Sequence, residues 1–367
     1  MSGLSFSSWA SRIPTIKTTF NFNEAELGTL LLALPIGSLI GLPLSGWLVS
    51  RFNSRVPLAF GYGLNMVSLA LIGFAHNTVS LVAAVMIFAF TTRIFNISVN
   101  TQAITLQKQF DKKIIGSFHG YWSTGGIAGI LLSTLFLALN VSMQVHFIIT
   151  AAIALAITIY SYQFLLRGDR AKTGNKIILR KPDPYILYLG LIVFCSAICE
   201  GGMFDWSGIY FQEVVKVEIF TYGYLIFMTF MAISRFISDF LIERIGMPAT
   251  YVMCSIFIAV GIALSIIFPY FWTAMIGFSL VGFGTAAVVP MSYALAGASK
   301  KYSPGLAISI IATYSITGML IGPPLIGYLA HAFGLRVSFI VFGLCGLMLI
   351  PISKLFFNYK HTVEKTI

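Results

Sequence analysis

Hydrophobic residues recur along the chain in runs of about 20, and a run of that length lets an α-helix cross about 30 Å of hydrocarbon. The strands of a membrane barrel would give shorter segments of alternating character. The pattern therefore predicts an all-α polytopic membrane protein with twelve spans. We place these spans near residues 1–20, 27–50, 56–75, 79–106, 115–138, 143–166, 185–211, 221–243, 248–268, 271–297, 305–330 and 335–357.

The domain organisation follows from the only long polar join. Residues 167–184 form a basic linker that separates six spans from six, so we expect bundles at 1–166 and 185–357 and a tail at 358–367. The first span is unusual, because only its first ten residues are apolar before Arg12 and Lys17. We expect a first helix shortened at its N-terminus, and a natural chain that begins ten or more residues earlier or an internal methionine start.

Composition supports a membrane class and charge placement gives an orientation. The chain is 57% hydrophobic and 10% charged, whereas soluble domains carry about 25% charged residues. Most Lys and Arg residues fall on one side of the predicted spans, and Lys17, Lys216 and Arg336 fall on the other. The basic side is the cytoplasmic one, so both termini are expected inside a bacterial inner membrane. The net charge of +11 then reflects topology and lipid headgroups rather than nucleic-acid binding.

The two halves of the chain look like repeats. Identical residues lie 193 positions apart, including Arg51 with Arg244 and Tyr121 with Tyr314. Further pairs at the same offset are Ser45 with Ser238, Phe90 with Phe283, Thr92 with Thr285, Gly125 with Gly318 and Gly129 with Gly322. Parallel six-helix repeats are a transporter device, with the substrate site near the membrane midplane between them.

A motif after the second span resembles a family signature. Residues 46–55 read Gly-Trp-Leu-Val-Ser-Arg-Phe-Asn-Ser-Arg, which looks like the cytoplasmic gate motif of the major facilitator superfamily. Ser50 and Asn53 depart from its acid and its glycine. The segments 8–14 and 200–207 are similar to those of the YbjJ-type bacterial members of that family. The resemblance implies two six-helix bundles related by a pseudo-twofold axis, with the first, fourth, seventh and tenth helices around a cavity.

Gate residues are expected at the motif in residues 46–55 and at its second-half copy in residues 238–246. Arg235, Asp239 and Glu243 follow one another at i, i+4 and i+8, a ladder suited to an intracellular gate. The predicted cytoplasmic gate comprises Gly46, Arg51, Arg55, Arg235, Asp239, Glu243 and Arg244.

Ionisable groups inside the spans are the candidates for proton coupling, because a charge in hydrocarbon is costly and usually faces water or a partner. Glu200 lies near the middle of the seventh span, where it either binds and releases a proton or pairs with an arginine. Asp205, about 140° around the helix, and His119 in the fifth span are further candidates. Arg12 is expected to snorkel or to pair with Asp205.

Candidate substrate contacts lie on the fourth span. Arg93, Asn96 and Asn100 share one helix face, and Arg93 either contacts an anionic or hydroxylated solute or serves as counter-ion to Glu200. Aromatic residues within spans are the remaining candidates, with helix packing as the alternative for each. They are Tyr121, Trp206, Tyr293 and Tyr314.

The sequence holds no phosphate-binding loop, no His-Glu-x-x-His helix and no metal-ligand cluster, so no enzyme, no metal and no cofactor other than a proton is expected. Its cysteines, Cys195, Cys199, Cys254 and Cys345, suit buried thiols. The expected partners are a small-molecule substrate and the lipid bilayer, with no nucleic acid, and the protein is expected to be a monomer. We therefore predict a secondary active transporter, a proton-coupled symporter of a small polar solute such as a sugar. An exporter of amphipathic compounds by proton antiport and a transport-dead receptor or scaffold are the alternatives.

Overall fold

The computed structural model describes the chain except residues 108, 111–114, 168–182, 300, 303 and 367. It also leaves out the side chains of residues 115–117, 119, 304, 305 and 363–366. Helices make up both compact units into which the described chain divides. One unit holds Met1–Asn21 and Thr29–Ile178, and the other holds Phe22–Gly28 and Leu179–Ile367.

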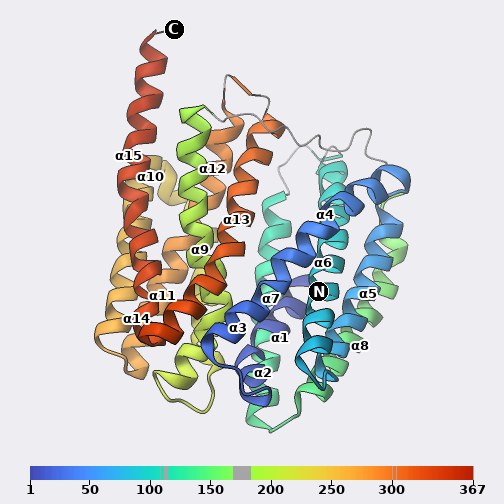
Figure 1. The fold of residues 1–367 in the computed structure, drawn as a ribbon. Coiled ribbons are helices and arrows are strands. Elements are labelled where there is room, and N and C mark those ends of the chain that lie inside the picture. The colour runs from blue at the N-terminus through green and yellow to red at the C-terminus, as the bar shows by residue number, and fades with distance from the viewer. Residues whose placement is uncertain (108, 111–114, 168–182, 300, 303, 367) are drawn as a thin grey trace. The chain divides into compact units, whose positions relative to one another are not determined.

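The first unit contains the helices of the N-terminal half (Figure 1). Short joins connect its apolar runs. They are α1 (Ser2–Ala10), α2 (Ile13–Thr19), α4 (Ala33–Arg51), α5 (Arg55–Gly73), α6 (Thr78–Gln107), α7 (Ile115–Ala138), α8 (Met143–Ser161) and the 3₁₀ turn η1 (Tyr162–Phe164).

The second unit contains the helices of the C-terminal half, together with the first residues of α3 (Glu24–Leu31). Helix α9 packs against both α13 and α15, and Figure 1 shows the three lying side by side. The helices are α9 (Pro184–Glu213), α10 (Thr221–Ile267), α11 (Phe271–Ala286), α12 (Val288–Gly297), α13 (Pro304–Phe333), α14 (Leu335–Ser338) and α15 (Ile340–Thr366).

The all-helical membrane fold is confirmed. In the described ranges, 10 helical segments are long and apolar enough to cross a bilayer. One of them is α10, which joins the predicted spans 221–243 and 248–268 through Gly246, whose backbone angles are φ 80° and ψ 160°. The predicted first span is divided into α1 and α2 at Ser11 and Arg12. Where we expected a tail from residue 358, α15 continues to Thr366.

The internal repeat has a counterpart in how each unit packs. A Cβ atom on Gly129 of α7 would lie 2.5 Å from the carbonyl oxygen of Leu4 in α1. Its repeat partner, Gly322 of α13, packs in the same way against Ile198 of α9, at 3.5 Å. Each of these glycines therefore lets the fifth helix of its half approach the first closely, as small residues do in membrane helix pairs.

A second crossing repeats at the same offset. A Cβ atom on Gly41 of α4 would lie 2.8 Å from the carbonyl oxygen of Phe90 in α6. In the second unit Ser234 of α10 donates a hydrogen bond of 2.8 Å to the carbonyl oxygen of Phe283 in α11. Gly41 and Ser234 lie 193 positions apart, and so do Phe90 and Phe283. The sequence repeat therefore marks equivalent helix contacts in the two units.

Arg12 is held inside the first unit. Its Nε donates to Nδ1 of His146 at 3.0 Å, and its terminal nitrogen donates to the carbonyl oxygen of Val141 at 2.8 Å. Because Nδ1 accepts, the proton of the neutral imidazole belongs on Nε2, 3.4 Å from the hydroxyl of Ser133. Arg12 and His146 are both buried. Arg12 is therefore bonded within its own unit, where we had expected it to snorkel or to pair with Asp205.

Candidate functional site

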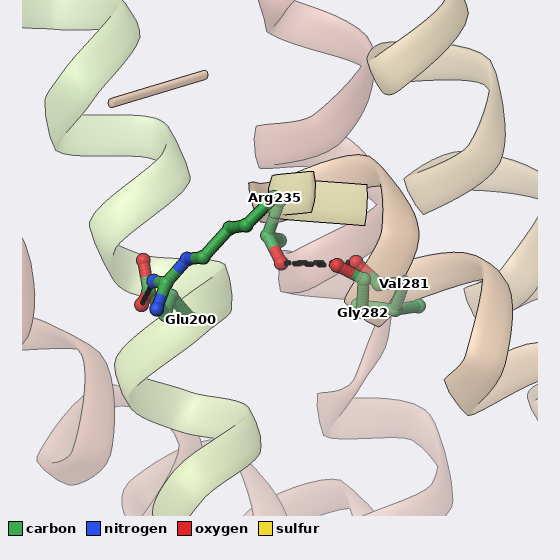
Figure 2. A network of polar contacts seen from close by, with 5 residues as sticks. Glu200, Arg235, Val281 and Gly282 are labelled. Atoms are coloured by element: carbon green, nitrogen blue, oxygen red, sulfur yellow. Dashed lines mark hydrogen bonds and ion pairs between the residues drawn. The ribbon is translucent and has the colours of Figure 1, made fainter. Parts of the chain in front are cut away.

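An ion pair lies within the helices of the second unit. Arg235 of α10 donates to Oε1 of Glu200 in α9 at 3.3 Å, as Figure 2 shows. Glu200 is 16 residues from the start of α9 and 13 from its end, so the pair lies near mid-length of that helix. Only 11% of the Glu200 side chain and 26% of the Arg235 side chain are exposed. The pairing lets two charges exist at a depth where either alone would be costly.

Local packing explains why Glu200 faces α10. One turn further along α9, Phe204 lies on the same face and contacts the rings of Tyr224 and Phe227 of α10, with centroids 5.9 and 5.7 Å away. This face of α9 is therefore fixed against α10. Tyr293 of α12 also lies close enough to Glu200 to interact with its charge.

The structure corrects the predicted surroundings of both charged residues. The counter-ion of Glu200 is Arg235, where the sequence had suggested Arg93 as an alternative. The ladder of Arg235 with Asp239 and Glu243 is not formed, because both acids are exposed and neither bonds to any residue that the structure describes. Arg235 therefore pairs with Glu200 inside the second unit, and its place in the cytoplasmic gate stays a prediction.

Asp205 is a second acid on α9 and has a different environment. Only 6% of its surface is exposed, and it makes no hydrogen bond or ion pair with the described part of the chain. Its neighbours along the helix, Phe204 and Trp206, are buried aromatic residues. A buried carboxyl group without a partner is costly in its charged form.

Trp206 is part of the helix packing. Its ring is fully buried, and its Nε1 donates to the carbonyl oxygen of Pro323 in α13 at 3.2 Å. We had predicted that Trp206 contacts the substrate, but its indole ring has no exposed surface in this structure. The adjacent Gly202 shows how tightly α9 is packed, because a Cβ atom there would overlap the ring of Phe342 in α15.

The polar face of α6 lies in the first unit. Arg93 is half-buried, its Nε is shielded from solvent and unpartnered, and the whole side chain makes no bond within the described residues. Asn96 is half-buried and Asn100 is exposed, and neither bonds to another described residue. Asn65 of α5 differs, because its amide nitrogen donates to the carbonyl oxygen of Phe88 at 2.8 Å. The predicted substrate stripe therefore holds unused hydrogen-bond donors.

The aromatic candidates are dispersed. Tyr121 of α7 is 75% exposed, and Tyr293 and Tyr314 are half-buried. Tyr314 of α13 lies against Gly190 of α9 and lines a cavity of about 270 Å³ in the second unit. The side chain of His119 lies outside the described residues.

The other gate candidates lie at helix ends. The Arg55 guanidinium stands 3.9 Å from the centre of the Tyr162 ring, and that of Arg244 stands 5.6 Å from the ring of Phe240. Arg51 is exposed, and a Cβ atom on Gly46 would meet nothing within 4 Å. Within the described ranges the four cysteines are free and there is no group of three or more residues that could hold a metal ion.

Sequence reasoning missed one polar clasp. The amide nitrogen of Gln102 in α6 donates to the hydroxyl of Ser54 at 2.6 Å and to the carbonyl oxygen of Leu166 at 3.1 Å. The backbone nitrogen of Leu166 donates in turn to the Gln102 side-chain oxygen at 2.9 Å. The available signal was Gln102 itself, a polar residue near the end of the apolar run 79–106. Nothing in the sequence near Gln102 points to Leu166, which lies 64 residues further along the chain.

Long apolar helices in two repeated units, with paired charges inside one of them, define a polytopic helical membrane protein of the transporter class. The chain belongs to the Major Facilitator Superfamily, whose profile matches residues 1–299 and 227–367.

Relatives and solved structures agree with this assignment. An uncharacterised transporter of Sinorhizobium fredii is 31% identical over 94% of this chain and 92% of its own. An uncharacterised MFS-type transporter of Yersinia pestis is 27% identical, over 96% and 91% of the two chains. The membrane protein MosC of Rhizobium meliloti is also 27% identical, over 91% and 82%.

The fold is shared with two groups of solved transporters. A bacterial homologue of the human lysosomal transporter Spinster, in an inward-facing and occupied conformation, has a TM-score of 0.78 at 14% identity, over 97% of this chain and 94% of the other. The nucleoside transporter NupG, in a mutant form, has a TM-score of 0.76 at 16% identity, over 97% and 98%.

Proposed function

We propose that this transporter moves a small polar solute, such as a sugar or a related metabolite, across a bacterial inner membrane, with both termini in the cytoplasm, and that protons drive it. The pair of Glu200 and Arg235 is the observation on which this rests. A carboxylate that is mostly buried beside one arginine has two ways to be neutralised, by that arginine or by a proton.

The coupling step follows from this chemistry. When Glu200 binds a proton, its negative charge is neutralised and its attraction to the Arg235 guanidinium weakens. Arg235 is the more exposed member, so it is the one able to turn toward water or solute. Alternation between these two states links proton binding to movement of α9 against α10.

Replacing Glu200 with Gln tests the coupling. We expect Glu200→Gln to abolish accumulation of solute under an imposed pH gradient and to spare exchange of solute without a gradient, because Gln keeps the shape of Glu but has no titratable proton. The measurement is uptake and counterflow in proteoliposomes, using sugars and sugar acids selected by a thermal-shift screen at two pH values. Accumulation equal to that of the unaltered protein would remove Glu200 as the proton carrier.

Asp205→Asn is the matched comparison, because Asp205 lies on the same helix and is also buried but unpartnered within the described residues. We assign the coupling proton to Glu200, so Asp205→Asn should keep accumulation in the same assay. Loss of accumulation in Asp205→Asn alone would transfer the role to Asp205.

Arg93 supplies the substrate-side prediction. Its unused donors suit an acceptor-rich solute, and a hydrogen bond to a charged group contributes about 1.5–3 kcal/mol. Arg93→Gln should therefore raise the KM for counterflow at least about tenfold. Arg93→Lys keeps the charge and should give a smaller increase. An unchanged KM in Arg93→Gln would show that Arg93 makes no contact with solute.

The direction of flux has its own test. A proton symporter accumulates solute in whole cells, whereas an antiporter that exports amphipathic compounds accumulates its solute in everted vesicles. Greater accumulation in everted vesicles would favour the exporter. Absence of counterflow for every ligand that stabilises the protein would favour a receptor.

A further inference from the structure

A groove of about 520 Å³ runs along the first unit between α5 and α8, which lie side by side in Figure 1. Helix α5 contributes residues at helical spacing, so one of its faces forms the wall for about three turns. Helix α8 and η1 contribute Leu155 and Tyr162. The α5 residues in the groove are Val56, Ala59, Phe60, Gly63, Leu64 and Val67.

The dimensions of the groove match a lipid chain. From Val56 to Val67 the α5 wall is about 16 Å long at 1.5 Å per residue. One leaflet occupies half of a hydrocarbon core that is about 30 Å thick, so its acyl chains span a similar length. Gly63 keeps the groove open, because a Cβ atom there would meet nothing within 4 Å. Apolar walls of this length suit an acyl chain.

The end of the groove at Val56 carries cations without counter-charges among the described residues. Arg55 stands over the Tyr162 ring, and its Nε is buried without a hydrogen-bond partner. The Gln102 side chain binds both Ser54 and Leu166, which are the chain neighbours of Arg55 and Arg167. In the part of the chain that the structure describes, no acid pairs with Arg51, Arg55 or Arg167. This is also the end that the distribution of Lys and Arg predicts to face the anionic cytoplasmic leaflet.

We propose that the groove binds an anionic phospholipid, with one acyl chain along α5 and the phosphate group at Arg55. An arginine binds phosphate through paired hydrogen bonds, and no described acid competes for Arg55. A zwitterionic lipid suits the rim less well, because its amine would meet arginines and no described carboxylate. The inference does not depend on the transported solute.

Native mass spectrometry of the purified full chain tests the proposal, with phosphatidylglycerol and phosphatidylcholine of identical acyl chains supplied in equal amounts. Phosphatidylglycerol should be retained at least about fivefold over phosphatidylcholine, the ratio expected for one charge contact of about 1 kcal/mol at a membrane surface. Arg55→Gln should bring the ratio close to one, and Arg55→Lys should keep most of the preference.

Two further variants separate the groove from the surrounding lipid annulus. Gly63→Leu places a side chain in the groove at a position where a Cβ atom meets nothing within 4 Å, and should remove one retained phosphatidylglycerol. Ala83→Leu, at an exposed position of α6, should not. Glycerol 3-phosphate, which has the phosphate but no acyl chain, should not displace the lipid. Equal retention of both lipids by the unaltered protein, or equal loss in Gly63→Leu and Ala83→Leu, would overturn the proposal. Displacement by glycerol 3-phosphate would overturn it too, because it would show a site for free phosphate compounds instead.

Discussion

Arg235→Gln is expected to lower the thermal stability of the protein strongly at pH 8 and much less at pH 5. Removing one member of a buried ion pair leaves the other charge uncompensated, at a cost of about 3–5 kcal/mol for a fully buried pair. Because 26% of the Arg235 side chain is exposed, we expect a loss at the lower end, about 3 kcal/mol. At lower pH Glu200 can escape this cost by binding a proton, so the loss should shrink.

The measurement is the unfolding midpoint in detergent at both pH values, for Arg235→Gln and for the double variant with Glu200→Gln. The double variant removes both charges, so it should recover most of the stability at pH 8 and show little added dependence on pH. A loss in Arg235→Gln that is the same at both pH values, and that the second substitution does not relieve, would mean that charge pairing with Glu200 contributes little to stability.

Gly261→Val should prevent normal packing of α10 against α11. Gly261 and Gly277 face each other across these helices, and a Cβ atom on either one would overlap the carbonyl oxygen of the other. A backbone oxygen cannot turn aside as a side chain can, so relief requires the helices to separate. Overpacking typically costs about 1–3 kcal/mol, and contact with the backbone oxygen of Gly277 places Gly261→Val at about 3 kcal/mol.

Thermal unfolding and the monodisperse fraction on size exclusion measure this effect. Gly46→Ala is the control, because Gly46 also lies within a helix but has nothing within 4 Å of a Cβ position. Gly46→Ala should be neutral or slightly stabilising, since alanine is the better helix former. If Gly261→Val unfolds at the same temperature as Gly46→Ala, the close approach of the two helices does not limit stability.

The helices were predictable from the sequence because each span needs a run of apolar residues, and this requirement is local. The break between the predicted spans 221–243 and 248–268 is confirmed, because Gly246 between them has non-helical backbone angles. The boundary prediction failed at the first span. The first span breaks at Ser11 and Arg12, where Arg12 leaves the helix to bond with His146.

The candidate site was predictable in part. A mid-span carboxyl group such as Glu200 can be recognised from the sequence, because a charge in hydrocarbon is costly and is usually paired or functional. The partner of Glu200 cannot be recognised in this way. The choice between Arg93 and Arg235 depends on the rotation of α9 about its axis and on which helix lies beside it. Arg12 and His146 are separated by 134 residues and no local pattern joins them. Trp206 shows the converse, because a tryptophan in a transporter span suggests ligand stacking but here fills a helix contact.

Gly246 divides α10 into two arms, residues 221–245 and 247–267, with no loop between them. Gly246 has the non-helical backbone angles φ 80° and ψ 160°, and Pro248 follows two residues later. Both arms of α10 pack on α11, the first through the hydrogen bond from Ser234 to Phe283 and the second through Gly261 against Gly277. A tilt of the arm that carries Arg235, once it leaves Glu200, would therefore alter contacts on the same helix that supports the second arm.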